Sequence, residues 1–188
     1  MRPPPLKALR YTLLMWAFAW VAAAAEPGFT VLSAVTREVD EVYQLDARID
    51  YTLSTDAREA LTNGVPLTLR LDIEILRPRP LMWDEVVASL NVRYRLSYHA
   101  LSRRYLVENR ASGAQHSYNT LYQALTALGT IRALPVLDKR LLEVGQVYDA
   151  RLRVVLDRED LPAPLRLMAY FSRAWTLNSP WFRWSLAS

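Results

Sequence analysis

The sequence predicts a mainly β protein, an antiparallel β-sandwich with two or three short helices. At least four segments alternate apolar and polar residues with a period of two, which is typical of strands with one buried and one solvated face. Strands of a parallel sheet are covered on both faces and would appear as continuous apolar runs, so the alternation favours antiparallel pairing. The 188-residue chain contains no cysteine, so its core must stabilise the fold without disulfides.

The first half of the chain contains the clearest strands. Residues 29–39 are strand-forming but alternate imperfectly, whereas residues 43–53 alternate without interruption. Residues 65–76 repeat this pattern, and the Arg-Pro-Arg-Pro sequence at 77–80 ends it, because proline has a fixed φ and lacks an amide donor. A strand that returns over residues 83–98 would complete a hairpin.

The second half of the chain is predicted to contain another hairpin and another long strand. Residues 105–110 and 115–118 flank a short connection with Gly113, which suits a hairpin turn. Residues 131–143 are ambiguous, and residues 148–156 alternate again.

The inward positions of these strands should form the core. Six of them are predicted to be buried: Leu69, Leu71, Tyr94, Leu96, Leu152 and Val154. On this assignment Leu71→Asp should prevent folding, because an unpaired carboxylate in a packed core is strongly destabilising. Arg70→Ala, on the opposite face of the same strand, should be mild.

Two or three short helices are indicated. Residues 56–59 resemble a capping box and predict a helix of about two turns, which Gly64 would end. Leucines at positions 121, 125 and 128 lie on one helical face before Gly129, and residues 165–172 form a further short helix.

Residues 1–25 have the composition of a cleavable signal peptide, and residues 26–188 are expected to form a single domain. A basic start leads into an uncharged apolar run over residues 11–25. As a helix this run would measure about 22 Å, short of a ~30 Å hydrocarbon core. Ala23 and Ala25 supply the small side chains that signal peptidase requires. We therefore expect a periplasmic protein that keeps no stable membrane span.

The composition of the mature chain excludes several classes of function. Three of the 23 basic residues lie in the leader, so the remainder nearly balance the 19 acidic residues and give no basis for binding nucleic acid. The five glycines are too dispersed for a phosphate-binding loop. His99 and His116 are 17 positions apart without further ligands at metal-site spacing, and are interpreted as solvent-facing. We therefore predict no catalytic residue, cofactor or metal site.

Charged residues on the polar faces of the strands permit two interpretations each. Four carboxylates could form a patch if their strands are neighbours: Asp46, Asp50, Asp72 and Glu74. Arg48 and Arg70 are interleaved with them, so cross-strand ion pairing is the simpler interpretation. Four arginines could form an anion-binding stripe or an ordinary solvated face: Arg93, Arg95, Arg151 and Arg153.

The aromatic C-terminus supplies the candidate interaction residues. They are Trp175, Trp181, Phe182 and Trp184. Because they can bury much apolar area, the simpler interpretation is a tail that covers the open end of the sandwich. The alternative is an exposed patch for a partner, a glycan or a membrane interface.

Several segments carry a resemblance to a known family. They are Trp83-Asp84-Glu85, residues 92–101, residues 105–109, residues 161–165 and residues 181–184. Together they resemble an exported proteobacterial family, the domain of unknown function numbered forty-three ninety, often labelled a proline-rich signal peptide protein. The resemblance covers residues 28–186 and implies no catalytic residues. It implies a signal sequence and a role near envelope signalling, since members are often encoded beside a membrane sensor kinase.

The function expected from these observations is a non-enzymatic periplasmic interaction module, with a membrane sensor kinase or another envelope protein as its partner. Two other classes stay open. An envelope carbohydrate hydrolase would need two carboxylates ~5 to 10 Å apart in a cleft. A carrier of a small ligand or lipid would need an apolar cavity of about 300 Å³ or more between the sheets.

Overall fold

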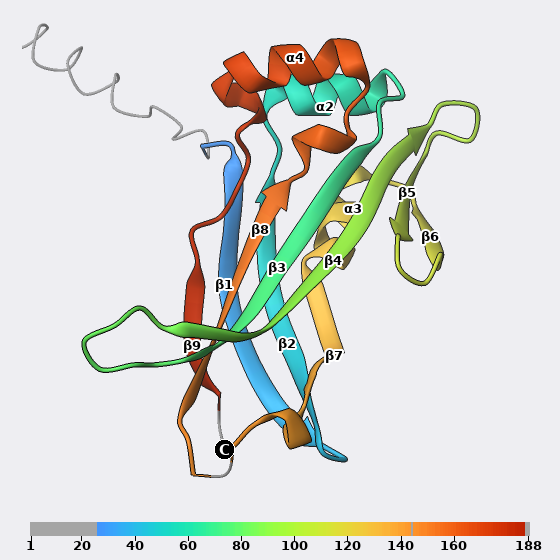
Figure 1. The fold of residues 1–188 in the computed structure, drawn as a ribbon. Helices are drawn as coiled ribbons and strands as arrows, with labels where there is room; N and C mark the ends of the chain where they lie inside the picture. The colour runs from blue at the N-terminus through green and yellow to red at the C-terminus, as the bar shows by residue number, and fades with distance from the viewer. Residues whose placement is uncertain (1–25, 144, 187–188) are drawn as a thin grey trace, which may run out of the picture.

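The protein is built from two antiparallel sheets, which confirms the predicted fold class. The computed structural model describes residues 26–143 and 145–186; the predicted signal peptide lies outside them. In Figure 1 the larger sheet lies in front of the smaller one. The smaller sheet has the order β1-β2-β7, with β1 at Gly28–Val39, β2 at Val42–Thr52 and β7 at Thr130–Asp138. The larger sheet has the order β6-β5-β4-β3-β8-β9, with β3 at Leu67–Arg77, β4 at Glu85–His99, β5 at Arg104–Asn109, β6 at Gln115–Tyr118, β8 at Tyr148–Leu156 and β9 at Phe182–Leu186.

Turn chemistry sets the pairing of the smaller sheet. Asp40 and Glu41 connect β1 to β2 with φ of 50° and 62°, which matches the twist of a two-residue hairpin. The ambiguous residues 131–143 form most of β7 and the 3-10 helix η1 (Lys139–Leu141). Within the part of the chain that the structure describes, β7 pairs only with β2, so it is an edge strand, where Pro135 is tolerated.

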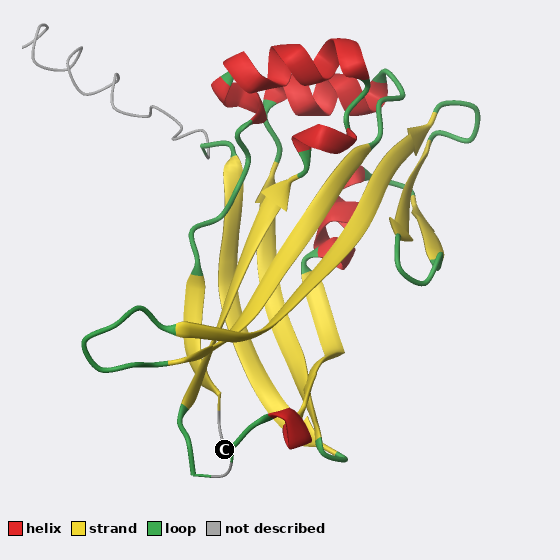
Figure 2. Cartoon of the chain, in the orientation of Figure 1, coloured by secondary structure: helices red, strands yellow, loops and turns green. Residues whose placement is uncertain are grey.

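Three α-helices are present in the described part of the chain. They are α2 (Thr55–Thr62), α3 (Leu121–Leu128) and α4 (Ala163–Phe171), and the 3-10 helices η2 (Arg158–Asp160) and η3 (Arg173–Trp175) flank α4. Figure 2 shows α2 and α4 together at one end of the molecule, here called the helical end. The cap of α2 differs from the predicted capping box: Ser54 is the N-cap, and its hydroxyl accepts from the Ala57 amide at 3.2 Å.

Close packing of α3 against the backbone of β2 requires glycine at position 129, which the sequence pattern did not indicate. Gly129 follows α3 with a φ of −78°, so a left-handed helix end is not the explanation. A Cβ at this position would lie 2.0 Å from the Ile49 carbonyl oxygen. The glycine therefore allows α3 to pack directly against the backbone of β2.

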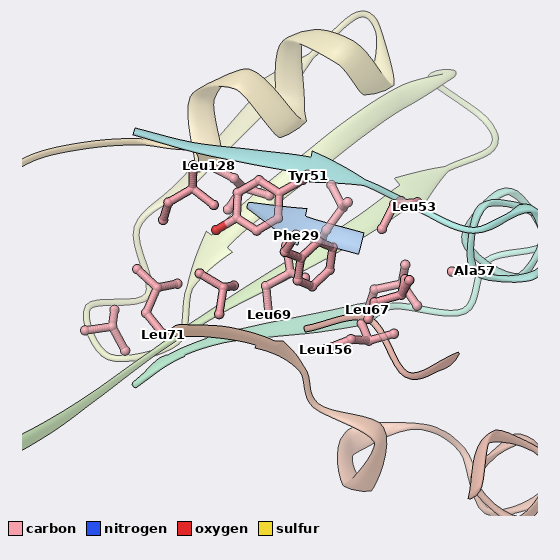
Figure 3. Packing of buried hydrophobic residues seen from close by; sticks show 14 of the residues in the cluster. Phe29, Tyr51, Leu53, Ala57, Leu67, Leu69, Leu71, Leu128 and Leu156 are labelled. Carbon is pink, nitrogen blue, oxygen red and sulfur yellow. The ribbon is translucent and has the colours of Figure 1, made fainter. Parts of the chain in front are cut away.

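The core lies between the sheets and extends to the helical end. Phe29 and Tyr51 of the smaller sheet meet edge to face, with ring centroids 5.0 Å apart, and Figure 3 shows Leu69 and Leu71 of β3 near them. Five of the six predicted core residues are buried, namely Leu69, Leu71, Leu96, Leu152 and Val154. Tyr94 is only half-buried, which corrects the prediction.

Candidate functional site

The outer face of the larger sheet gathers most of the charged residues that the sequence singled out. Because side chains alternate along a strand, burying Leu69, Leu71 and Ile73 turns Arg70, Asp72 and Glu74 of β3 outward. The pairing register then places Arg93 of β4 opposite Arg70, Arg153 of β8 opposite Asp72, and Arg151 of β8 opposite Glu74. We call this surface the outer face.

Ion pairs across the strands organise the outer face. Asp72 is buried, and it accepts from Arg70 Nε at 2.9 Å and from Arg153 Nε at 3.0 Å. Glu74 accepts from Arg151 Nε at 2.7 Å. Cross-strand ion pairing is therefore present between β3 and β8, but its cations are Arg151 and Arg153. Arg70, which the sequence offered as a partner, pairs with Asp72 within β3.

A second buried carboxylate extends the network. Asp157, which follows β8, lies 3.5 Å from Arg70 Nη1 and 3.8 Å from Arg93 Nε. Farther along, Asp160 accepts a hydrogen bond from the Thr68 hydroxyl and lies 3.7 Å from Arg95 Nη2. The outer face therefore carries a connected network of charges.

A hollow of about 700 Å³ lies on the outer face. Its lining residues are Arg70, Asp72, Glu74, Ser89, Asn91, Arg93, Arg110, Ala111 and Arg153. Four of these are cations and two are carboxylates. Arg93 and Arg110 keep 56% and 43% of their side-chain surface exposed. Arg110 Nη1 also pairs with Glu108 Oε1 at 3.1 Å. The hollow is therefore polar and lined by four arginines, two of them partly exposed, and guanidinium groups of this kind suit an anionic ligand.

The four candidate aromatic residues do not form one patch. Trp175 is buried. Phe182 and Trp184 are half-buried on the inner face of β9, and Trp184 Nε1 donates to Thr36 Oγ1 of the smaller sheet at 3.3 Å. Trp181 lies instead on the outer face, with the guanidinium carbons of Arg151 and Arg153 at 4.4 and 4.5 Å from its ring centroid.

The four candidate carboxylates are divided between the two sheets. Asp46 and Asp50 lie on β2, and so are separate from Asp72 and Glu74 on β3. The Ala133 amide donates to Asp46 Oδ1 at 2.9 Å, and Arg37 pairs with the same carboxylate. These two donors, the amide first, hold the pKa of Asp46 below its ordinary value.

The four candidate arginines share the outer face, on β4 and β8 to either side of β3.

His99 and His116 are exposed, as predicted, and His99 Nδ1 lies 3.0 Å from the Ser102 hydroxyl. Sequence patterns missed the roles of Asp157 and Arg110. Asp157 lies in a connection without a periodic pattern, and Arg110, the last residue of the strand predicted over residues 105–110, lies just after β5. Only the tertiary fold brings them to the hollow and its ion pairs.

A second cavity lies at the opposite end from α2 and α4. It measures about 490 Å³, and its apolar walls come from Tyr43, Leu142, Tyr148 and Leu186. Charged and polar residues complete its lining, namely Glu41, Lys139, Arg140, Glu143 and Gln146. We call it the end pocket.

The described residues contain no group of three or more His, Cys, Asp or Glu side chains placed to bind a metal ion. Among the helices of residues 26–143 and 145–186, none combines the length and the apolar character needed to cross a membrane.

The fold and the outer face together define a class of protein, a two-sheet antiparallel β domain whose larger sheet presents an arginine-rich polar hollow. The chain belongs to the family described as a domain of unknown function, DUF4390, which matches residues 26–185. This confirms the resemblance inferred from the sequence motifs. No curated protein and no solved structure matches the chain significantly.

Proposed function

We propose that this protein is a non-enzymatic interaction module of the periplasm that binds an acidic segment of an envelope partner. The membrane sensor kinases implied by the family resemblance are the expected class of partner. The single observation that carries the proposal is the arginine-lined hollow beside Trp181 on the outer face.

Buried carboxylates preorganise this hollow for an anionic partner. Asp72 fixes Arg70 and Arg153 by short hydrogen bonds, so these guanidinium groups need little further ordering when a ligand arrives. Arg93 and Arg110 keep about half of their side-chain surface exposed, and Arg110 shares its guanidinium with Glu108. A guanidinium group can bind a carboxylate of a partner through two parallel hydrogen bonds. Trp181 adds a flat apolar surface next to the charges, as interfaces commonly do.

The same geometry favours binding over glycoside hydrolysis. A hydrolase needs one carboxyl group that holds a proton and a second that is free to act as base or nucleophile. Asp72 and Glu74 are each paired with arginine, and the pKa of Asp46 is lowered where a general acid requires it raised.

Capture from envelope extracts tests the proposed function. The exported protein should retain a specific membrane protein, and retention should weaken as salt rises. Arg93→Glu combined with Arg110→Glu should abolish retention, because two exposed cations of the hollow become anions. Arg48→Glu combined with Arg132→Glu is the matched control, since these exposed arginines lie on the smaller sheet. Equal capture by both double variants would refute the assignment to the outer face.

The end pocket supports a second candidate function, the carriage of a small amphipathic ligand. Its volume of about 490 Å³ exceeds the ~300 Å³ that such a ligand needs, and its walls are mainly apolar. Mass spectrometry of protein recovered from the periplasm should then find a bound small molecule. Leu142→Trp, which would fill the pocket, should eliminate it. Protein that carries no small molecule would remove this candidate.

A further inference from the structure

The helical end exposes an apolar helix face. In α4, Leu167, Met168 and Phe171 are 68%, 65% and 91% exposed. These three positions share one side of an α-helix, whereas Ala169 on the opposite side is fully buried. Contiguous apolar surface of this kind is uncommon on soluble monomers unless it has a binding role. Among the described residues, the helix therefore presents an apolar face without a packing partner at one end of the molecule.

The β4–β5 turn adds a second apolar projection at the same end. Leu101 in this turn is 94% exposed. β4 pairs with β3 only as far as Leu96, so its last residues extend past the start of β3 towards the level of α2 and α4. Figure 1 shows the turn rising to the height of the helices. Two separate apolar projections at the same end of the molecule fit a flat partner surface better than a narrow groove.

The segment that carries α4 is basic. Residues 161–175 include Arg166 and Arg173 and contain no acidic residue. Arg158 stacks on Tyr170 of α4, with its guanidinium carbon 5.1 Å from the ring centroid. Arg166 and Arg173 are both exposed, and Arg166 donates to the Leu161 carbonyl oxygen. The acidic residues at this end lie on α2 and η2: Asp56, Glu59 and Glu159 are exposed, and Asp160 is paired with Arg95.

The chain also enters the fold at the helical end. β1 begins at Gly28, which pairs with Thr52, two residues before the Ser54 cap of α2. The apolar run of residues 11–25 precedes this point directly in the sequence. The leader predicted for residues 1–25 would therefore tether the protein by its helical end during export.

We propose that the helical end docks on the surface of an anionic phospholipid bilayer. Leu167, Met168 and Phe171 enter the boundary between headgroups and acyl chains, and the exposed Arg173 that follows α4 supplies a cation for the phosphates. This inference goes beyond the proposed function and uses no residue of the outer face.

Vesicle binding tests the inference on protein recovered from the envelope after export. The protein should sediment with vesicles that contain phosphatidylglycerol and much less with vesicles of phosphatidylcholine alone. Leu167→Ser combined with Phe171→Ser should lower the affinity for vesicles about tenfold or more, because two inserted side chains are lost. Phe171→Trp should retain binding and show a blue-shifted tryptophan emission when vesicles are added.

Trp83 provides the matched control. It is 93% exposed in the connection between β3 and β4, which projects from the side of the molecule and not from the helical end (Figure 1). Trp83→Ser should leave vesicle binding unchanged. The inference is overturned if the protein ignores both kinds of vesicle, or if Trp83→Ser weakens binding as much as the α4 variant. A dimer that dissociates when Leu167 and Phe171 are replaced, without any vesicle binding, would identify a second copy as the occupant.

The two proposals fail separately. Loss of vesicle binding in the α4 variant with intact capture of an envelope protein supports both. Failed capture with intact vesicle binding removes only the role assigned to the outer face.

Discussion

The environment of Arg70 differs from the one that strand alternation predicts. Alternation places Arg70 on the polar face of its strand and predicts that Arg70→Ala is mild. In the structure its guanidinium contacts two buried carboxylates, Asp72 and Asp157. Removing it would leave both with fewer donors, which is costly for buried charged groups.

We therefore expect Arg70→Ala to destabilise the protein by about 1 to 3 kcal/mol, the usual range when a buried polar group loses its partner. Arg48→Ala, at an exposed position of β2, should change stability by less than ~0.5 kcal/mol. Thermal or urea unfolding of the two variants measures the difference. Equal stabilities would mean that the ion pairs of the outer face add nothing measurable.

Leu71 tests the assignment of the core face. Its side chain is fully buried between the sheets. Leu71→Asp should abolish cooperative folding, because an unpaired buried carboxylate costs several kcal/mol against a total stability of ~5 to 15 kcal/mol. Circular dichroism and thermal scans measure this, with Arg48→Ala as the control. A cooperative transition near the wild-type temperature would contradict the strand register.

Removing the hydroxyl of Tyr51 is expected to stabilise the protein, in contrast to the substitutions at Arg70 and Leu71. Its hydroxyl is buried and has no hydrogen-bond partner among the described residues. Burial first, and then the neighbouring Tyr94, raises the pKa of Tyr51. Tyr51→Phe should therefore stabilise the protein by about 1 kcal/mol, since it removes an unsatisfied buried hydroxyl and keeps the packed ring.

The melting temperature of Tyr51→Phe measures this effect. An increase of about 2 to 4 °C corresponds to ~1 kcal/mol in a domain of this size. A decrease would show that the hydroxyl has a partner after all, such as a buried water.

At the scale of elements, the C-terminal tail belongs to the larger sheet. Residues 182–186 form the edge strand β9, so Trp181 and Trp184 point to opposite faces. Arg183 pairs with Asp149 of β8 and with Asp84, and these contacts, Asp149 first, raise its pKa. Trp184 reaches the smaller sheet through Thr36.

Deleting residues 180–188 should therefore lower the melting temperature by several degrees or more. The deletion removes the hydrogen bonds of β9 with β8 and uncovers apolar surface beneath Phe182 and Trp184. An unchanged melting temperature would show that the tail is dispensable for folding. In that case Trp181, Phe182 and Trp184 would be better explained as a partner-binding segment.

At the scale of the whole molecule, the two proposed binding surfaces point in different directions. The outer face runs along the strands, whereas the apolar face of α4 lies at their end (Figure 1). A protein docked on a bilayer by its helical end would therefore leave the hollow of the outer face accessible to a membrane-bound partner.

Export is the prediction that concerns the whole chain. The mature protein should begin at Glu26 or within two residues of it, because Ala23 and Ala25 follow a short apolar run. Intact-mass measurement on protein from the periplasm tests this. A mass that retains residues 1–25 would indicate an uncleaved membrane anchor.

Period-two alternation determined most of the strands, and turn residues determined their ends. These signals are local: the face of a strand and the position of a proline can be identified within about ten residues of sequence. Residues 43–53, 65–76 and 148–156 accordingly form strands close to their predicted bounds. The family was also identifiable, because its motifs are short runs along the chain.

The tertiary structure alone decided which sheet each strand joins, and hence what the charged residues do. Asp46 and Asp72 lie on similar polar faces, yet one strand joins the smaller sheet and the other becomes the centre of the larger one. Asp157, Arg110 and Trp181 reach the outer face from connections far apart in sequence. Long-range pairing depends on how whole faces pack against each other, and no local pattern encodes that.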